Sequence, residues 1–329
     1  MARRDIVVVG ASAGGVEALG ALVGELPAEL AAAVFVVLHV APEHKSVLPS
    51  ILSAAGPLPA KHARDGEPIV SGRIYVARPD HHLTLQDGQV RVVKGPRENG
   101  HRPAVDALFR TAAHTYGPRA IGVILSGALD DGTAGLIAIK RQGGLTLVQD
   151  PEDALVEQMP RSAMENVQVD YVLPVREIGR RLPSLVAQAV HGPSPERPAL
   201  LAAEAAMVLR GSSDGSVKIG EPSALACPSC GGVLNEVHDG HLVRYRCQVG
   251  HGFSPESLYS EKRLAQEGAL WMALRALEEQ AALGRRLAVR ARELHQIKAA
   301  ARYEDRASAA EEQAKLVRQV LLLGSAPKD

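Results

Sequence analysis

Short β-branched runs alternate with helical patterns over roughly the first 190 residues of the chain. The runs are apolar throughout, which is typical of strands that are buried on both faces of a parallel sheet. Between them, apolar residues recur at helical spacing, as in crossover helices. Strands are expected at Ile6–Val9, Val34–Leu38, Arg73–Ala77, Leu83–Gln86, Val90–Val93, Ile121–Leu125, Leu145–Gln149 and Tyr171–Leu173, and helices near Val16–Gly24, Val47–Ala54, Val105–Tyr116, Thr133–Gln142, Met159–Asn166 and Val175–Ala189. The pattern predicts an α/β domain at residues 1–190, with a doubly wound, mostly parallel sheet and helices on both faces.

The pattern changes after this domain. Residues 191–223 are rich in Pro, Gly and Ser, with a short helix expected at Leu200–Leu209, and we interpret them as a linker. Residues 224–257 carry all three cysteines and are expected to form a small zinc-ribbon-like unit. Residues 258–329 show helical periodicity, with breaks expected at Gly268 and Gly284. The sequence therefore predicts four successive regions.

Composition and charge narrow the classes of function. The 329 residues are 46% hydrophobic and 22% charged, which is typical of a globular protein in water. Lys+Arg and Asp+Glu each number 37, so net charge does not indicate a nucleic acid or an anionic membrane as partner. No apolar run suits a secretory signal or a membrane span, and three cysteines do not make a disulfide framework. We expect a cytoplasmic protein without nucleic-acid binding or membrane insertion.

A lone serine, Ser12, lies in a glycine-flanked turn between the first predicted strand and helix. The pattern G-x-S-x-G at such a turn fits a nucleophile elbow, whereas a dinucleotide-binding turn would need glycine at position 12. Free N–H groups at the helix start would also favour a developing oxyanion. Serine is equally a common helix cap. The turn alone leaves a cap, a nucleophile and a nucleotide-binding module open.

Three predicted strands lead to the residue types of a serine hydrolase: Ile6–Val9 leads to Ser12, Val34–Leu38 runs directly into His39, and Ile121–Leu125 runs into Ser126-Gly-Ala-Leu-Asp-Asp-Gly132. Chemistry in doubly wound sheets gathers beyond the carboxyl ends of strands. Ser12 would be the nucleophile, His39 its base and one aspartate the group that orients the imidazole. We prefer Asp131 because it directly precedes Gly132. Taken singly, each signal is also compatible with a structural histidine or a turn.

Backbone N–H groups are the expected stabilisers of an oxyanion. The N–H of Ala13 lies at the predicted helix start, and the Gly127–Ala128 loop offers a second source. His101 and Arg102 lie between predicted elements. We expect them either to shape the substrate cleft or to be structural, with Arg102 paired to a carboxylate, and leave them outside the catalytic set.

Five motifs identify a known family. They are Gly10-Ala-Ser-Ala-Gly-Gly15, Val37-Leu-His-Val-Ala-Pro42, His101-Arg-Pro-Ala-Val-Asp-Ala-Leu-Phe109, Gly122-Val-Ile-Leu-Ser-Gly-Ala-Leu-Asp-Asp-Gly132 and Gln158-Met-Pro-Arg161. With these motifs in order, the stretch from about Asp5 to Ala189 resembles the catalytic domain of the chemotaxis protein-glutamate methylesterases. The resemblance implies a serine esterase that releases methanol from glutamate γ-methyl esters on methyl-accepting chemoreceptors or similar signalling proteins. It allows glutamine deamidation as a second activity, requires no cofactor for the chemistry, and maps the triad onto Ser12, His39 and Asp131.

The sequence departs from this family at three points. Ala13 replaces a frequent threonine, and Ala128 replaces a usual methionine beside the oxyanion region. The family's usual N-terminal receiver domain is not expected, because the matching motifs begin within ten residues of Met1, and neither is control by phosphorylation in cis. The altered oxyanion region keeps a catalytically weak signalling scaffold as an alternative function, beside a nucleotide-binding module that uses the Gly10–Gly15 turn.

The cysteines have metal-ligand spacing. Cys227-x2-Cys230 is followed after sixteen residues by Cys247-x3-His251, and two such knuckles commonly close one tetrahedral structural zinc site. Either His238 or His241 could replace His251 as the fourth ligand. The alternative is a set of unligated thiols.

Helical periodicity marks the C-terminal region. Apolar residues follow a four-three-four spacing at Leu270, Leu274, Leu277 and Ala281, and roughly again at Leu287, Leu294, Ile297 and Ala301. The shortness of this pattern favours an intramolecular helical hairpin over a coiled coil. Such a hairpin could also dimerise the chain or dock a partner.

Overall fold

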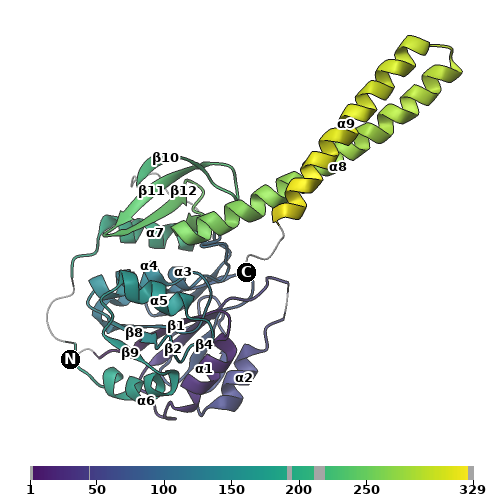
Figure 1. The fold of residues 1–329 in the computed structure, drawn as a ribbon. Coiled ribbons are helices and arrows are strands. Elements are labelled where there is room, and N and C mark those ends of the chain that lie inside the picture. Colours follow the sequence, from purple (N-terminus) through teal and green to yellow (C-terminus); the bar gives the residue numbers. More distant parts are fainter. Residues whose placement is uncertain (1–2, 44, 191–194, 211–218, 325–329) are drawn as a thin grey trace. The chain divides into compact units, whose positions relative to one another are not determined.

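The structure, a computed structural model, describes residues 3–43, 45–190, 195–210 and 219–324. They fall into two compact units, Met1–Leu258 and Tyr259–Asp329 (Figure 1). The strands are β1 (Ile6–Ala11), β2 (Ala33–Leu38), β3 (Ala60–His62), β4 (Ile74–Val76), β5 (His82–Gln86), β6 (Gln89–Val93), β7 (Ala120–Ile124), β8 (Leu145–Gln149), β9 (Tyr171–Leu173), β10 (Glu221–Ala226), β11 (Val233–Asp239), β12 (Leu242–Cys247) and β13 (Gly252–Phe253). The helices are α1 (Gly15–Gly24), α2 (Leu48–Ala55), α3 (Val105–Tyr116), α4 (Thr133–Arg141), α5 (Gln158–Asn166), α6 (Val175–Val186), α7 (Ala199–Arg210), α8 (Pro255–Glu293) and α9 (Ile297–Gly324), with a 3₁₀ turn at Gly117–Arg119.

A seven-stranded sheet lies at the centre of the first unit, in the order β3-β4-β2-β1-β7-β8-β9. Every neighbouring pair in it is parallel. From β1 the chain forms β2, β3 and β4 on one side of β1, with β4 lying between β2 and β3, and then β7, β8 and β9 on the other side. This reversal beside β1 makes the sheet doubly wound, as predicted, and creates the switch point at which such folds place their sites.

Two apolar cores cover the two faces of this sheet. Alternate side chains of β1 face opposite ways: Val7 and Val9 join the core beneath α1, α2 and α6, while Ile6 and Val8 join the core beneath α3, α4 and α5. Figure 1 shows these two sets of helices on opposite faces of the sheet. Because both faces are buried, the strands carry uninterrupted apolar runs, which is why they could be predicted.

Two short features complete this part of the unit. The edge strand β3 was not predicted, because Ala60-Lys-His62 contains no apolar run. The β5–β6 hairpin forms as predicted, and its turn residues Asp87 and Gly88 both have positive φ values, as a primed hairpin turn requires. Among the described residues, no helix has both the length and the apolar character that crossing a membrane demands.

A four-stranded antiparallel sheet, β10-β11-β12-β13, belongs to the same compact unit. The segment predicted as a linker, 191–223, contains α7 where a short helix was expected, and α7 buries Leu201, Ala205 and Val208. Residues 191–194 and 211–218 of that segment lie outside the described residues. The four predicted region boundaries themselves stay a prediction.

The second unit is a hairpin of α9 against most of α8. Its apolar contact contains Leu274, Ala314 and Leu321. The expected breaks at Gly268 and Gly284 were wrong, since α8 runs through both glycines. A Cβ at Gly284 would come within 3.0 Å of the Ala307 Cβ, so this glycine permits close approach of α9 instead of ending the helix. Dimerisation or partner docking through the hairpin stays a prediction.

Candidate active site

Ser12 lies in a tight turn between β1 and α1. Its N–H donates to the Ser126 carbonyl at 2.9 Å, and its own carbonyl accepts the Gly15 N–H at 2.9 Å. Gly14 has a φ of 73°, and a Cβ there would lie 2.7 Å from both Leu155 Cβ and Ser126 Oγ. The glycine is therefore needed for backbone conformation and for close packing. Leu155 and Ser126 fill the space beside Gly14, so this side of the turn leaves no room for a phosphate group and does not favour nucleotide binding.

The structure brings Ser12, His39 and Asp131 together from the ends of three strands. The Ser12 hydroxyl donates to His39 Nδ1 at 3.1 Å, and His39 Nε2 lies 2.7 Å from Asp131 Oδ2. Because a carboxylate can only accept, the Nε2 proton points to Asp131 and Nδ1 is left unprotonated to receive the serine proton. The arrangement can therefore deprotonate the Ser12 hydroxyl.

Asp131 is 1% exposed and is surrounded by donors. Besides His39, its carboxylate accepts the Val105 and Asp106 N–H groups at 2.7 and 3.1 Å, and the Asn99 side-chain amide at 2.9 Å. Burial raises the pKa of Asp131, but the hydrogen bond from His39 and the backbone donors outweigh it and hold that pKa well below its usual range. The carboxylate is thus ionised, and α3 directs its N-terminus at it.

The neighbouring carboxyls behave differently. Asp130, the alternative orienting group, is hydrogen-bonded to the Ser254 hydroxyl at 2.7 Å, and burial raises its pKa to about 6. Asp106 was not predicted as part of the site. Its burial and the nearby charge of Asp131 raise its pKa to about 7. Asp131 is therefore the carboxylate that orients His39 in this structure.

His101 and Arg102 have separate roles in the geometry. The His101 ring stacks on His39 with the centroids 3.6 Å apart, and burial together with His39 lowers the pKa of His101 to about 4. His101 is thus a neutral wall of the site near pH 7. Arg102 donates to Asp80 at 2.9 Å through Nε and to the Gly95 carbonyl at 2.8 Å. Arg102 is thus paired with a carboxylate, as one of the two expectations had it.

Of the backbone N–H groups expected to stabilise an oxyanion, that of Gly127 is already hydrogen-bonded in the structure. The Gly127 N–H donates to the Val156 carbonyl at 2.9 Å, so Gly127 cannot supply a free donor. This loop still lies against the nucleophile, because a Cβ at Gly127 would come within 2.9 Å of the Ser12 Cβ. The N–H groups of Ala13 and Ala128 donate to no protein group in the described part of the chain. These two remain the candidate donors.

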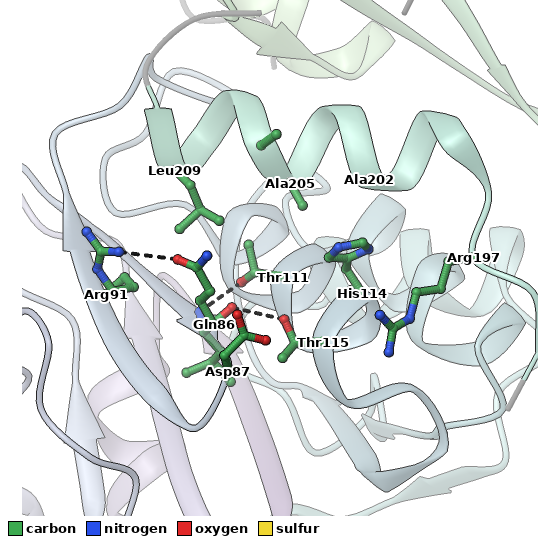
Figure 2. A pocket seen from close by; sticks show the side chains of 12 residues that line it. Gln86, Asp87, Arg91, Thr111, His114, Thr115, Arg197, Ala202, Ala205 and Leu209 are labelled. Atoms are coloured by element: carbon green, nitrogen blue, oxygen red, sulfur yellow. Dashed lines mark hydrogen bonds between the residues drawn. The ribbon is translucent and has the colours of Figure 1, made fainter. Parts of the chain in front are cut away.

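A cavity of about 310 Å³ adjoins the triad; it is lined by His39, Val40, Ala41, Pro42, Arg97, Gly100, His101 and Arg102. A larger cavity of about 470 Å³ lies elsewhere, between the β5–β6 hairpin, α3 and α7. Figure 2 shows His114, Arg197 and Asp87 around the larger one, which contains no member of the triad. We therefore assign the smaller cavity as the candidate substrate cleft.

The predicted metal ligands also meet. One ligand atom from each of Cys227, Cys230, Cys247 and His251 lies within 4.8 Å of all the others. Each pair sits in a turn, closed by the Gly231 N–H on the Cys227 carbonyl and by the Cys247 N–H on the His251 carbonyl. Among the described residues, neither His238 nor His241 belongs to this cluster.

Comparison with known proteins agrees with the geometry of the serine site. The family model described as CheB methylesterase matches residues 7–182, which is more than half of the chain and includes the whole triad. The chain belongs to the CheB methylesterase family. This family consists of carboxylic ester hydrolases.

Relatives of known name support this assignment. A putative protein-glutamate methylesterase/protein-glutamine glutaminase of Leptospira interrogans is 40% identical over 175 residues, which are 53% of this chain and 91% of that protein. A protein of Anaeromyxobacter dehalogenans named protein-glutamate methylesterase/protein-glutamine glutaminase 2 is 42% identical over 184 residues, 56% of this chain and 54% of that protein. The matching segment of this chain thus spans about half the length of the Anaeromyxobacter dehalogenans protein.

The fold is also shared with a solved CheB structure. The crystal structure of the Thermotoga maritima CheB methylesterase catalytic domain is similar with a TM-score of 0.53 and 38% sequence identity, and the match covers 55% of this chain and 98% of that one. The matched CheB segment, residues 7–182, ends before α7. The cysteine cluster, α8 and α9 therefore lie outside the part of the chain that the family model matches.

Proposed function

We propose that this chain hydrolyses glutamate γ-methyl esters on methyl-accepting chemoreceptors or similar signalling proteins and releases methanol. The observation that carries the proposal is the continuous hydrogen-bonded series from Ser12 through His39 to Asp131 in a domain of the CheB methylesterase family. The names of the relatives support glutaminase activity as a second reaction at the same site.

The geometry suggests how each step would proceed. As Ser12 Oγ attacks the ester carbonyl, His39 Nδ1 takes the hydroxyl proton, and Asp131 stabilises the imidazolium. The N–H groups of Ala13 and Ala128 would stabilise the tetrahedral oxyanion. His39 then returns the proton to the departing methoxide, which leaves as methanol. His39 then takes a proton from a water molecule that attacks the acyl-enzyme, and returns it to Ser12 Oγ as the ester bond breaks. This leaves the glutamate side chain of the receptor as a carboxylate and restores the Ser12 hydroxyl. With glutamine, ammonia would leave instead, and neither reaction requires a cofactor.

The Ser12→Ala variant tests this proposal. Methanol release from methylated receptor should fall by roughly 10⁴-fold or more, because the nucleophile is removed. The midpoint of thermal unfolding should change little, since His39 is the one hydrogen-bond partner of the Ser12 hydroxyl within the described part of the chain. A serine-directed phosphonate should label Ser12 of the wild-type chain.

Other outcomes would favour other functions. Unchanged methanol release in Ser12→Ala would contradict the triad. Thermal stabilisation by a nucleotide without phosphonate labelling would support a nucleotide-binding module. A folded wild-type chain that neither releases methanol nor reacts with the phosphonate would support a signalling scaffold.

We also propose that Cys227, Cys230, Cys247 and His251 hold one structural zinc ion in a zinc-ribbon-like unit at about 224–257. Zinc bond lengths of about 2.3 Å to sulfur and 2.0 Å to nitrogen give tetrahedral edges of about 3.8 Å between two sulfurs and about 3.5 Å between sulfur and nitrogen. The Cys230 and Cys247 Sγ atoms lie 3.7 Å apart, and Cys247 Sγ lies 3.5 Å from His251 Nδ1. Four protein ligands would leave no open position, so the ion would stabilise structure.

A further inference from the structure

The Asn99 side chain connects the active site to the start of α8. Its Nδ2 donates to Asp131 at 2.9 Å and to Asp106 at 3.0 Å. Its Oδ1 accepts the Ser254 N–H at 2.9 Å and the Ser257 hydroxyl at 3.0 Å. Asn99 is 5% exposed, and all four hydrogen-bonding positions of its amide are used.

These partners determine which way the amide points. The Ser254 N–H can only donate, and an ionised Asp131 can only accept, so Oδ1 must face α8 and Nδ2 must face the carboxylates. With the amide reversed, Oδ1 would oppose the buried charge of Asp131 at hydrogen-bond distance. The side-chain orientation of Asn99 therefore depends on groups that lie about 155 residues further along the chain.

Ser254 and Ser257 are themselves held firmly in place. The Ser254 hydroxyl accepts the Ser257 N–H at 3.0 Å, which caps the first turn of α8, and donates to Asp130 at 2.7 Å. Both serines are buried. The preceding strand is attached as well, since the Asn99 N–H donates to the Gly252 carbonyl at 2.8 Å. All these contacts lie within the first compact unit.

We propose that Ser254 and Ser257 are positioning residues of the esterase site. They fix the amide of Asn99, Asn99 holds Asp131, and Asp131 holds the His39 imidazole in the orientation that accepts the Ser12 proton. Neither serine touches a reacting atom. The consequence for catalysis rests on the proposed esterase function, whereas the effect on the His39–Asp131 hydrogen bond does not. The inference implies that the CheB site is completed by a segment that the family model does not match.

The test compares the full-length Ser254→Ala/Ser257→Ala variant with wild type. The first measurement is the downfield proton NMR signal of the His39 Nε2–H that is bonded to Asp131. We expect this signal to shift or broaden for two reasons. Asn99 Oδ1 loses the hydrogen bond from the Ser257 hydroxyl, and the Ser254 N–H, its other donor, is no longer held in place by the Ser254 hydroxyl cap. The second is the rate of Ser12 labelling by a phosphonate, which we expect to fall about tenfold, as when supporting partners of a site are removed.

Three further variants make the test specific. Asn99→Ala removes the whole connection and should give an equal or larger loss of labelling. Ser260→Ala, one turn further along α8, should match wild type in both measurements. Ser257→Thr keeps the hydroxyl and should retain most of the labelling rate, which a loss caused only by loosened packing would not predict.

The outcomes separate the two proposals. A folded double variant with the wild-type NMR signal and labelling rate overturns the positioning role. If the double variant does not fold, Ser257→Ala alone decides the question, because the Ser254 cap stays. If wild type itself is not labelled, the esterase proposal fails, and the NMR signal still decides whether these serines orient His39 through Asn99.

Discussion

The two sheets of the first unit are stabilised by different interactions: apolar burial for the parallel sheet, and buried ion pairs beside a small apolar cluster for the four-stranded sheet. The parallel sheet is buried on both faces by large apolar cores. The four-stranded sheet has a small cluster of its own, consisting of Cys227, Leu234, Cys247, Phe253 and Leu258. Where its strand β12 meets α3 and α7, buried ions replace apolar contacts: these are Glu98, Arg110, Glu204, Arg244 and Arg246.

The buried ions form one connected network. The Glu98 carboxylate accepts hydrogen bonds from Arg110 at 2.9 Å and from Arg246 at 3.0 Å. The Glu204 carboxylate accepts hydrogen bonds from Arg244 at 2.7 Å and from Arg246 at 3.0 Å. Burial raises the pKa of Glu204, yet its arginine partners outweigh burial and hold that pKa well below its usual range. Apolar burial is non-directional and tolerant of conditions, whereas such a network depends on every partner and on pH.

Metal removal should give the largest difference between the two sheets. Cys230→Ser should abolish binding of the zinc ion proposed for this cluster and open the four-stranded sheet, because structural zinc contributes on the order of 10 kcal/mol and the apolar cluster there is small. Metal content and limited proteolysis with peptide mapping measure both effects. Cleavage should appear within 224–253 while β1–β9 stay protected. The neighbouring Ser229→Ala is the control, and a metal-free wild-type chain with the same protection would contradict the prediction.

Glu204→Gln should weaken the ion network and lower the free energy of unfolding by about 3–5 kcal/mol at pH 7, because the buried arginines around it lose one of their carboxylate partners. Because the pKa of Glu204 is lowered in the folded state, the stabilisation by this carboxylate must decrease as the pH falls. The stabilisation is fully present above the unfolded pKa of about 4.3 and is lost as pH falls toward the folded value. The difference from wild type, measured by urea unfolding, should therefore shrink below pH 4.

A substitution in the apolar core of the parallel sheet, at Leu22 of α1, provides the comparison for Glu204→Gln. Leu22→Ala should lower the free energy of unfolding by about 2–5 kcal/mol through loss of apolar burial, with the same loss at every pH at which the chain is folded. Equal pH dependence in Leu22→Ala and Glu204→Gln would show that the ions do not distinguish the two regions.

His101 should give the smallest of these effects. Its folded pKa of about 4 lies below the unfolded value of about 6.5, so the unfolded state binds more protons between these values and stability falls as pH decreases. This residue should remove about 2 kcal/mol of stability between pH 7 and pH 5. His101→Gln should reduce the pH-dependent loss by that amount, measured by urea unfolding at both pH values. An unchanged loss would show that His101 does not titrate as described.

Most of the parallel sheet could be predicted because each strand carries its own local signal. β1 and β2 are continuous apolar runs, and the residue that follows each strand was therefore placed at the correct edge. Ser12 and His39 could be predicted for this reason, whereas Asp131 lies further along the loop after its strand and was preferred for its place directly before Gly132. β3 carries no such signal, and Gly284 resembles a helix break until the close approach of α9 is seen.

The supporting contacts could not be predicted in this way. Glu204 lies among alanines and looks like an exposed helical residue, because nothing nearby in sequence indicates that arginines of β12 surround it. Asn99 looks like a loop residue for the same reason. The sequence Ser254-Pro-Glu-Ser257 does resemble a helix start, and a capping analysis could have found it. Its contact with the active site depends on tertiary structure alone.

The positions of the network's residues along the chain determine when its contacts can form during protein synthesis. A ribosome completes every strand of the parallel sheet once residue 173 has been added, but Arg244 and Arg246 emerge only about seventy residues later. Until then Glu204 lacks both of its β12 partners, and Asn99 lacks the serines of α8. The contacts that orient the Asn99 amide and complete the ion network can therefore form only after every strand of the parallel sheet has been synthesised.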